Sequence, residues 1–290
     1  MPRLETSARA KLNLTLDVLR RREDGYHDLR MVMQSVELCD TITLETGGDA
    51  GLTVRTNLSY LPHDKRNLAA AAALRFREVT GKGWDSLSIH IQKRIPVCAG
   101  MGGGSSDAAA VLRALNEITE AGLSPGRLVR LGSAVGSDVP YCVLGGTALA
   151  EGRGEILTPL PPLPACEIVI CKPDFFIPTP VLFSRINCAK IRCRPDTAGV
   201  IAALEGGDLG GVARRLYNVF EDVLPRRCGG EIREIKKELV GCGALGAAMS
   251  GTGPSVFGIF DCPACAQDAL AALARTYRNV FLTHPVPPQV

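Results

Sequence analysis

The sequence predicts an α+β fold with two unlike halves, and three observations support this prediction. Strand-like and helix-like patterns alternate in the first half, a proline-rich stretch interrupts the chain at 158–164, and the second half is richer in helical patterns. The 290 residues have room for two modest domains, and 46% hydrophobic with 22% charged residues is ordinary globular composition.

Alternation of apolar and polar residues predicts four strands in the first half. Leu12, Leu14 and Leu16 alternate with polar neighbours, which is the period-2 pattern of a strand with one buried face. A second stretch repeats the pattern with Val36, Ile42 and Leu44. The expected strands are Ala8–Leu19, Met31–Leu44, Gly51–Arg55 and Ser86–Ile91.

Three helices are expected between and after these strands. One segment is rich in alanine, the residue with the highest helix propensity. Another carries Ala109, Leu112 and Leu115 along one face, and a third opens with Ser124 as an N-cap before Pro125. The expected helices are Asn67–Glu78, Ser105–Ile118 and Pro125–Val135.

The stretch Thr158–Pro164 is the clearest composition break, with four prolines in seven residues. Such a run continues neither a helix nor a central strand, so we place the domain boundary here, between residues 1–158 and 159–290. The elements expected beyond it are the strands Glu167–Cys171 and Ser255–Phe260 and the helices Thr197–Leu204, Leu209–Tyr217, Gly230–Val240 and Gln267–Thr276.

Charge and hydropathy exclude several classes of protein. The net charge is only +3, from 33 basic and 30 acidic side chains, so no nucleic-acid partner is expected. No segment approaches the roughly 18 uninterrupted apolar residues of a membrane span, so no membrane partner is expected either. The stretch Met1–Lys11 has no apolar signal core, which predicts a cytoplasmic protein.

The eleven cysteines are odd in number and scattered from Cys39 to Cys265. Without a secretion signal, a disulfide framework is not expected. Cys262-Pro-Ala-Cys265 is a lone CxxC, and a zinc site needs a second pair of ligands at suitable spacing. We therefore predict reduced thiols and no metal site built from them.

The strongest local signal is a glycine-rich segment between a predicted strand and a predicted helix. Four of the five residues from Gly100 to Gly104 are glycine, and Ser105 and Ser106 follow directly. Glycines allow backbone N–H groups to converge on an anion, and the helix start adds its own free N–H groups. Because strand, glycines, serines and helix occur together, Ala99–Asp107 is predicted to bind phosphate; the alternative is a flexible loop before a capped helix.

Two common nucleotide-binding motifs do not fit this loop. A Walker A loop needs a lysine before its hydroxyl residue, and here Gly104 precedes Ser105 directly. Gly100-Met-Gly102 begins a dinucleotide fingerprint, but no βαβ repeat with an acidic residue about 20 positions on is evident.

The segment Pro96-Val-Cys-Ala-Gly-Met-Gly-Gly-Gly-Ser-Ser106 resembles the phosphate loop of the superfamily of galactokinase, homoserine kinase, mevalonate kinase and phosphomevalonate kinase, the GHMP kinases. Ala10-Lys-Leu-Asn-Leu14 resembles its N-terminal motif, and Met249-Ser-Gly-Thr-Gly-Pro-Ser255 resembles its C-terminal glycine motif. The three motifs occur in the expected order and span nearly the whole chain.

Three further segments are similar to a subfamily whose acceptor carries a cytidine diphosphate group: Gly25–Leu29, Gly136–Pro140 and Ile177–Phe183. The phosphate loop departs slightly, with Met101 where leucine is usual and Cys98 where alanine or glycine is common. Both changes are apolar, and neither touches the expected chemistry.

The resemblance implies a fold and a reaction. An N-terminal domain related to the ribosomal S5 domain 2-like fold and a C-terminal ferredoxin-like domain would enclose the site between them. ATP with Mg²⁺ would phosphorylate the 2-hydroxyl of 4-diphosphocytidyl-2-C-methyl-D-erythritol in the non-mevalonate route to isoprenoids. A monomer or a weak homodimer is expected.

The resemblance also assigns Lys11 and Asp138 as the catalytic residues. Lys11 lies among apolar residues of a predicted strand, an unfavourable place for a single charge, and pairing with Asp138 would resolve this. The carboxylate of Asp138, next to Val139-Pro140 on an expected fixed turn, can accept the proton of the acceptor hydroxyl. Read alone, Lys11 would be a strand-edge lysine and Asp138 a turn residue.

The remaining site residues divide between the two ligands. Tyr26 and Phe183 are suited to stack on cytosine and His27 to hydrogen-bond its edge, while Asn13 and Thr179 add polar contacts. The residues expected to bind the nucleotide are Asn67, Lys93, Pro96, Ala99, Gly100, Met101, Gly102, Gly103, Gly104, Ser105 and Ser106. Gly251–Gly253 is expected to support the floor of the site.

Two other functions stay open from the sequence. A sister kinase of the homoserine or mevalonate type would keep the loop without a cytosine slot, and Tyr26-His27 argues against it. A non-enzymatic sensor of phosphate ligands would not need Lys11 and Asp138, and both are present.

Overall fold

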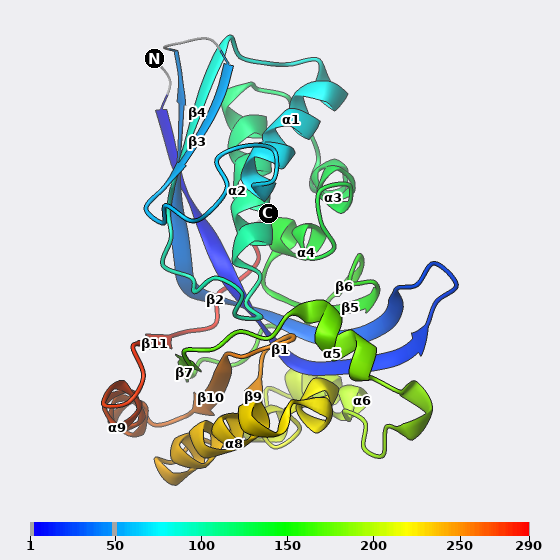
Figure 1. The fold of residues 1–290 in the computed structure, drawn as a ribbon, viewed down its shortest axis with the longest axis vertical. Helices are drawn as coiled ribbons and strands as arrows, with labels where there is room; N and C mark the ends of the chain where they lie inside the picture. The colour runs from blue at the N-terminus through cyan, green and yellow to red at the C-terminus, as the bar shows by residue number, and fades with distance from the viewer. Residues whose placement is uncertain (1–2, 48–50, 290) are drawn as a thin grey trace.

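The structure is a computed structural model that describes residues 3–47 and 51–289. Its strands form two sheets, one of seven strands and one of four, each accompanied by helices. Figure 1 shows the larger sheet in the upper part of the molecule with α1–α4 along one side, and the smaller sheet below it with α8 and α9. The predicted α+β class is confirmed.

The larger sheet is built around two long antiparallel strands. Its main path has the order β3-β4-β2-β1-β8, and β5 and β6 extend it beside β2. Every strand predicted in the first half is present, and both long strands extend beyond their predicted ends. The bounds are β1 Arg3–Arg21, β2 His27–Thr46, β3 Gly51–Thr56, β4 Ser86–Gln92, β5 Thr147–Gly152, β6 Ile156–Pro159 and β8 Tyr217–Asn218.

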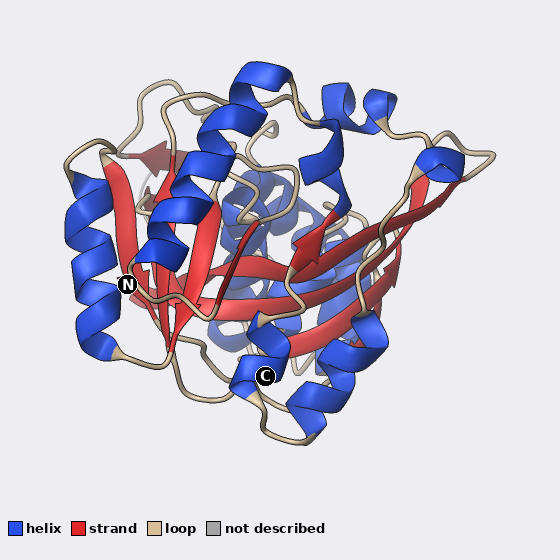
Figure 2. Ribbon diagram, turned by 90° about the horizontal axis from the view of Figure 1, so that it is seen from below, coloured by secondary structure: helices blue, strands red, loops and turns tan. Residues whose placement is uncertain are grey.

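Irregularities in β1 bend the sheet at the place where its functional side chains lie. The register with β2 shifts between Arg9 and Lys11, between Asn13 and Thr15, and again before Arg20. Bulges of this kind increase the local twist and re-aim side chains, and they are common next to active sites. Figure 2 shows these long strands curving across the molecule with helices outside them.

Four helices cover one face of the larger sheet: α1 Leu68–Thr80, α2 Gly103–Ile118, α3 Pro125–Ser133 and α4 Val139–Leu144. Asn67 caps α1 by accepting a hydrogen bond from the backbone N–H of Ala69 at 3.0 Å. Ser124 stands at the N-cap of α3 as predicted, but its side chain makes no capping hydrogen bond. The short α4 was not predicted, because six residues give too little periodicity to detect.

The smaller sheet is antiparallel, with the order β11-β7-β10-β9. Its bounds are β7 Glu167–Lys172, β9 Gly246–Met249, β10 Val256–Phe260 and β11 Asn279–Thr283, with α8 Arg226–Gly241 and α9 Pro263–Ala274 in the connections. Chain order and spatial order together give a β-α-β-β-α-β unit, the arrangement of ferredoxin-like domains. The unpredicted β11 completes this unit.

The second half also reaches into the first sheet. The predicted helix Leu209–Tyr217 is too long: α7 ends at Ala213, and Tyr217–Asn218 instead forms β8, which pairs in parallel with Thr15 and Leu16 of β1. Pairing with a strand some 200 positions away overrides local preference, so sequence could not reveal it. The other elements are α5 Thr179–Arg185, the 3₁₀ helices Cys188–Lys190 and Val219–Val223, and α6 Thr197–Glu205.

The chain leaves the larger sheet at the end of β6, Pro159, and its next strand belongs to the smaller sheet. The boundary at 158/159 stays a prediction. All eleven cysteines are free thiols. Within residues 3–47 and 51–289, no helix combines the length and apolar character needed to cross a bilayer.

Candidate active site

A cavity of about 1050 Å³ lies between the two halves and brings predicted residues from five segments together. Its walls come from β1, the β1–β2 turn, the glycine-rich loop, the start of α4, and α5 with the loop before β10. The predicted residues that line it are Lys11, Asn13, Tyr26, His27, Gly100, Gly102, Asp138, Thr179 and Phe183. Distant parts of the sequence therefore converge on one space large enough for a nucleotide-sized ligand.

Lys11 and Asn13 project into this cavity from the same face of β1. The Lys11 side chain is only 5% exposed, and its ammonium donates to Asn13 Oδ1 at 2.7 Å. Asp138 Oδ2 lies 3.6 Å from the same Nζ, and this carboxylate is 34% exposed. The predicted pairing of Lys11 with Asp138 is thus present, and the carboxylate keeps an open side toward the cavity.

Asp138 stands at the N-cap position of α4, where the backbone is fixed by Val139-Pro140. Its side chain makes no capping hydrogen bond, so its oxygens are not committed to the helix. A carboxylate that is held in place, paired with an ammonium and open to a cavity has the chemistry of a general base. A hydroxyl group placed against Asp138 could give up its proton there.

The glycines of the phosphate loop are required by close contacts with the second half. Gly100 has φ +76°, and a Cβ there would stand 2.0 Å from the carbonyl oxygen of Ser250. Gly102 has φ +69°, and its Cβ would press on the Lys11 side chain at 3.0 Å. The loop therefore passes directly over the Lys11 side chain, and only glycine fits at these positions.

The C-terminal glycine motif, Met249–Ser255, forms a hydrogen bond with this loop. Ser250 Oγ donates to the carbonyl of Gly100 at 3.0 Å and accepts from the backbone N–H of Asn13 at 3.2 Å. The amide of Asn218 donates to the carbonyls of Met249 and Gly251, both at 2.8 Å, and fixes the motif in turn. Ser250 therefore connects the loop to β1, while the supporting role expected of Gly251–Gly253 stays a prediction.

Aromatic side chains form the far wall of the cavity. The rings of His27 and Phe183 lie 5.0 Å apart and tilted by 32°, and Phe183 packs edge-on against Phe220 at 4.9 Å. Tyr26 is 54% exposed at the mouth. An aromatic wall with an exposed ring beside it offers flat faces on which a nucleobase can stack.

The geometry of this cavity agrees with what comparisons with known proteins find. GHMP kinases N terminal domain matches residues 67–146, and GHMP kinases C terminal matches residues 200–279. The 4-diphosphocytidyl-2-C-methyl-D-erythritol kinase of Alkaliphilus metalliredigens is 43% identical over 97% of this chain and 96% of its own length. That of Clostridium perfringens is 41% identical over 98% of both chains.

The chain belongs to the 4-diphosphocytidyl-2-C-methyl-D-erythritol kinase family. A crystal structure of 4-(cytidine 5'-diphospho)-2C-methyl-D-erythritol kinase superposes with a TM-score of 0.82 at 33% identity and covers 97% of this chain and 99% of that one. Homoserine kinase from Cytophaga hutchinsonii gives 0.76 at 18% identity over 100% and 96%, which shows a shared fold.

Within this family member, the imidazole of His27 has a defined charge state. Burial lowers the pKa of His27, and the nearby Arg21 lowers it further. The ring is therefore neutral at neutral pH and presents one donor and one acceptor nitrogen. A neutral imidazole next to Phe183 suits recognition of an uncharged base edge.

Two arginines at the cavity were not predicted. The guanidinium carbon of Arg153 lies 3.9 Å from the centre of the Tyr26 ring, which holds the ring through a cation–π contact. Arg21 lines the same cavity. Arg153 follows β5 and Arg21 ends β1, and surface arginines at strand ends carry no signal that marks them as functional. Both would place positive charge beside an anionic acceptor.

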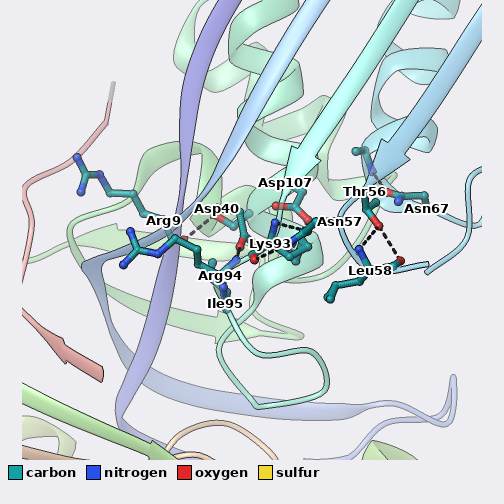
Figure 3. A network of polar contacts seen from close by, with 12 residues as sticks. Arg9, Asp40, Thr56, Asn57, Leu58, Asn67, Lys93, Arg94, Ile95 and Asp107 are labelled. Atoms are coloured by element: carbon teal, nitrogen blue, oxygen red, sulfur yellow. Dashed lines mark hydrogen bonds and ion pairs between the residues drawn. The ribbon is translucent and has the colours of Figure 1, made fainter. Parts of the chain in front are cut away.

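Several residues predicted to bind the nucleotide lie outside this cavity. The Asn67 side chain caps α1 and also donates to the carbonyl of Pro62 at 3.0 Å. Ser106 is buried, and its hydroxyl donates to the carbonyl of Arg9 at 2.5 Å. The Lys93 ammonium is buried between two carboxylates, as Figure 3 shows. Roles for these residues in nucleotide binding stay predictions.

The rest of the loop is arranged around the start of α2. Within the loop, Ala99 and Met101 are buried and Gly104 is exposed, and Pro96 just before the loop is half-buried. Gly103 opens α2 in its first turn. The first turn of a helix leaves backbone N–H groups free, and such groups bind phosphate in other proteins. Cys98 has φ +53° and is exposed to the cavity.

Proposed function

We propose that this protein transfers the γ-phosphoryl group of ATP to the 2-hydroxyl of 4-diphosphocytidyl-2-C-methyl-D-erythritol, in the non-mevalonate route to isoprenoid precursors. One observation carries the proposal: a single cavity contains the Lys11–Asp138 pair, the glycines of the phosphate loop and the His27–Phe183 wall. Membership of the family supports the same acceptor, since its relatives bear that name.

Each end of the cavity suits one part of the reaction. His27 and Phe183 bind cytosine, with Tyr26 at the mouth, and Asn13 and Thr179 position the acceptor's polar groups. Thr179 Oγ1 lies 3.0 Å from Thr252 Oγ1, so α5 and the glycine motif meet next to the acceptor. An acceptor held this way presents its hydroxyl to Asp138.

Asp138 accepts the hydroxyl proton as the acceptor oxygen attacks phosphorus. Lys11, which is desolvated and fixed by Asn13, stabilises the negative charge that develops. The backbone N–H groups of residues 100–105 hold the phosphates. When bound with ATP, magnesium would neutralise negative charge on its phosphates.

No group of three or more histidine, cysteine, aspartate or glutamate side chains suited to a metal is present among the described residues. We propose that magnesium enters with the phosphates of ATP. The even balance of charge gives no support for a nucleic-acid partner, and we propose a cytoplasmic protein that works as a monomer or a weak homodimer.

A coupled assay of ADP release tests the proposal. Purified protein with MgATP should turn over the cytidylylated methylerythritol and leave homoserine and mevalonate untouched. Turnover of homoserine or mevalonate at a comparable rate would assign the protein to a sister kinase. Absence of ADP release with every acceptor, in protein that still binds ATP, would favour a sensor.

A further inference from the structure

Three charged side chains lie buried together beneath the phosphate loop. Asp40 comes from β2, Lys93 follows β4, and Asp107 lies in the first helical turns of α2. Their side chains are 0%, 4% and 5% exposed. The Lys93 ammonium contacts a carboxylate oxygen of Asp40 and lies 2.8 Å from Asp107 Oδ2, so one cation serves two acids (Figure 3).

Asp40 holds the start of the loop. Its Oδ1 accepts hydrogen bonds from the backbone N–H groups of Arg94 at 2.6 Å and Ile95 at 2.8 Å, while Oδ2 accepts from Lys93. The backbone N–H of Lys93 donates to Asn57 Oδ1 at 2.8 Å, and Asn57 Nδ2 donates to the Lys93 carbonyl at 3.1 Å. Every oxygen of Asp40 is therefore satisfied while it is ionised.

Asp107 is less completely hydrogen-bonded than Asp40, because its Oδ1 is buried and has no hydrogen-bond partner. With all three groups ionised, two carboxylates and one ammonium leave a net charge of −1 in a region closed to water. A buried charge without a partner is strongly unfavourable. A proton on one of the two acids would remove the excess charge.

This cluster lies directly under the phosphate-binding backbone. A Cβ on Gly103 would stand 3.2 Å from the Lys93 ammonium nitrogen. Phosphate groups bound over Gly102 and Gly103 would therefore be repelled by a net negative cluster and tolerated by a neutral one. The charge state of the cluster is thus coupled to the anion above it.

The surroundings of Asp107 contain little else that titrates near neutral pH. The charged groups acting on it are Lys93 and Asp40. Cys142 of α4 also faces it, and burial raises the pKa of that thiol to about 12, so it stays neutral. On β1, the backbone carbonyl of Arg9 accepts a hydrogen bond from the Ser106 hydroxyl. The Lys11 ammonium donates a hydrogen bond to Asn13 and forms an ion pair with Asp138.

Burial raises the pKa of Asp107 to about 7, with Lys93 opposing the rise and Asp40 adding to it. Asp40 and Asp107 share one ammonium, and Asp40 already accepts three hydrogen bonds. Asp107 is therefore the acid that takes up the proton.

We infer that Asp107 is a positioning residue of the phosphate loop that carries a proton when nucleotide is bound. The inference rests on the proposed function, in which residues 100–105 bind the phosphates of ATP. Nucleotide binding above neutral pH then takes up a proton from solution, and the affinity for nucleotide falls as the pH rises.

Titration calorimetry with ADP and excess magnesium, in two buffers of different ionisation heat, measures this proton directly. At pH 8 the wild-type protein should take up close to one proton per nucleotide, and at pH 6 close to none. The dissociation constant of the wild-type protein should rise by up to about tenfold per pH unit above 7. Asp107→Asn, which mimics the neutral acid, should take up no such proton and bind with an affinity independent of pH over this range.

Asp17→Asn is the matched control, because Asp17 is also a buried acid, paired with Arg194 at 2.6 Å, and takes no part in the cluster. It should keep the wild-type uptake. Protonation of the nucleotide itself is the same for all variants and cancels in the comparison.

Equal uptake in wild-type protein and Asp107→Asn would overturn the inference, as would loss of nucleotide binding by a folded Asp107→Asn at every pH. If Asp107→Asn does not fold, the wild-type measurement decides alone: nucleotide binding without proton uptake at pH 8 overturns the inference and leaves the proposed function intact. Absence of nucleotide binding by the wild-type protein would overturn both.

Discussion

Two lysines lie next to the same phosphate loop, and their surroundings differ in an instructive way. Lys11 faces the cavity and is paired with one carboxylate, Asp138, that is 34% exposed. Lys93 lies on the other side of the loop between Asp40 and Asp107, both nearly without exposure. Both lysines are buried, so burial alone does not mark a catalytic group. In our proposals, the lysine whose carboxylate partner is open to the cavity takes part in the reaction, and the lysine whose partners are buried positions the loop.

The largest effect on turnover is expected at Lys11 and Asp138, the pair that faces the cavity. Asp138→Asn should lower kcat by about 10²–10⁴-fold, because an amide cannot accept the hydroxyl proton. Binding of both substrates and the melting temperature should stay near wild type. Steady-state kinetics checks this, with Asp268→Asn on the surface of α9 as the control. Activity within about threefold of wild type would remove Asp138 from its assigned role.

The buried cluster of Asp40, Lys93 and Asp107 should instead affect the stability of the protein. Lys93→Met leaves two buried carboxylates without their shared cation and should lower the free energy of unfolding by about 3–5 kcal/mol. Lys11→Met, whose partner is open to water, should cost less stability and more turnover. Urea unfolding measures the first effect and steady-state kinetics the second.

The double variant Lys93→Met/Asp107→Asn should regain part of the stability lost in Lys93→Met, because one of the two acids is gone. Lys93→Met with wild-type stability would contradict the contrast between the two lysines.

The acceptor wall should affect one substrate selectively. Tyr26→Ala and Phe183→Ala should each raise the dissociation constant of the acceptor by about one to two orders of magnitude, from stacking worth about 1–3 kcal/mol per aromatic–base contact. The affinity for ATP should barely change. Calorimetry with each ligand separately checks this.

Tyr26 gives the cleaner test because it is 54% exposed, whereas Phe183 also packs on Phe220. Equal weakening of both ligands by Tyr26→Ala would identify Tyr26 as a folding element and remove it from the cytosine site.

The smallest expected effect is the dependence of stability on pH. The pKa of Asp107 is raised in the folded state, so its contribution is full at acidic pH and is lost as the pH rises toward and through about 7. Between pH 6 and 8 the wild-type protein should lose about 1–2 kcal/mol more than Asp107→Asn. Parallel pH profiles of the two proteins, measured by urea unfolding, would contradict this.

Residues that line the open cavity could be recognised in the sequence because they stand in contiguous motifs, while their roles stay predictions. Lys11 and Asn13 share a strand motif, and Gly100–Ser106 forms a recognisable loop. The sealed cluster could not be predicted. Asp40 meets Lys93 across 53 positions, and a single aspartate in a strand pattern gives no sign of its partner. Sequence reasoning assigned Lys93 to the nucleotide because it precedes the loop, and only the fold reveals its two acids.

The same distinction applies to the fold. Long, regular elements such as β1 and α2 were predicted close to their observed positions. β8 and β11 were missed because two and five residues become strands only through pairing with distant partners. Arg153 was missed for a related reason, since its contact with Tyr26 exists only when β5 lies beside β2.

The contact between Gly100 and Ser250 has a consequence for how the protein could be divided. The hydroxyl of Ser250 supports the phosphate loop, and the backbone at Gly100 fits against it with no room for a side chain. A chain cut within 158–164 would yield two fragments, neither with a complete nucleotide site. Recovery of ATP binding on mixing them would therefore report reassembly, which makes this protein a natural starting point for a split reporter.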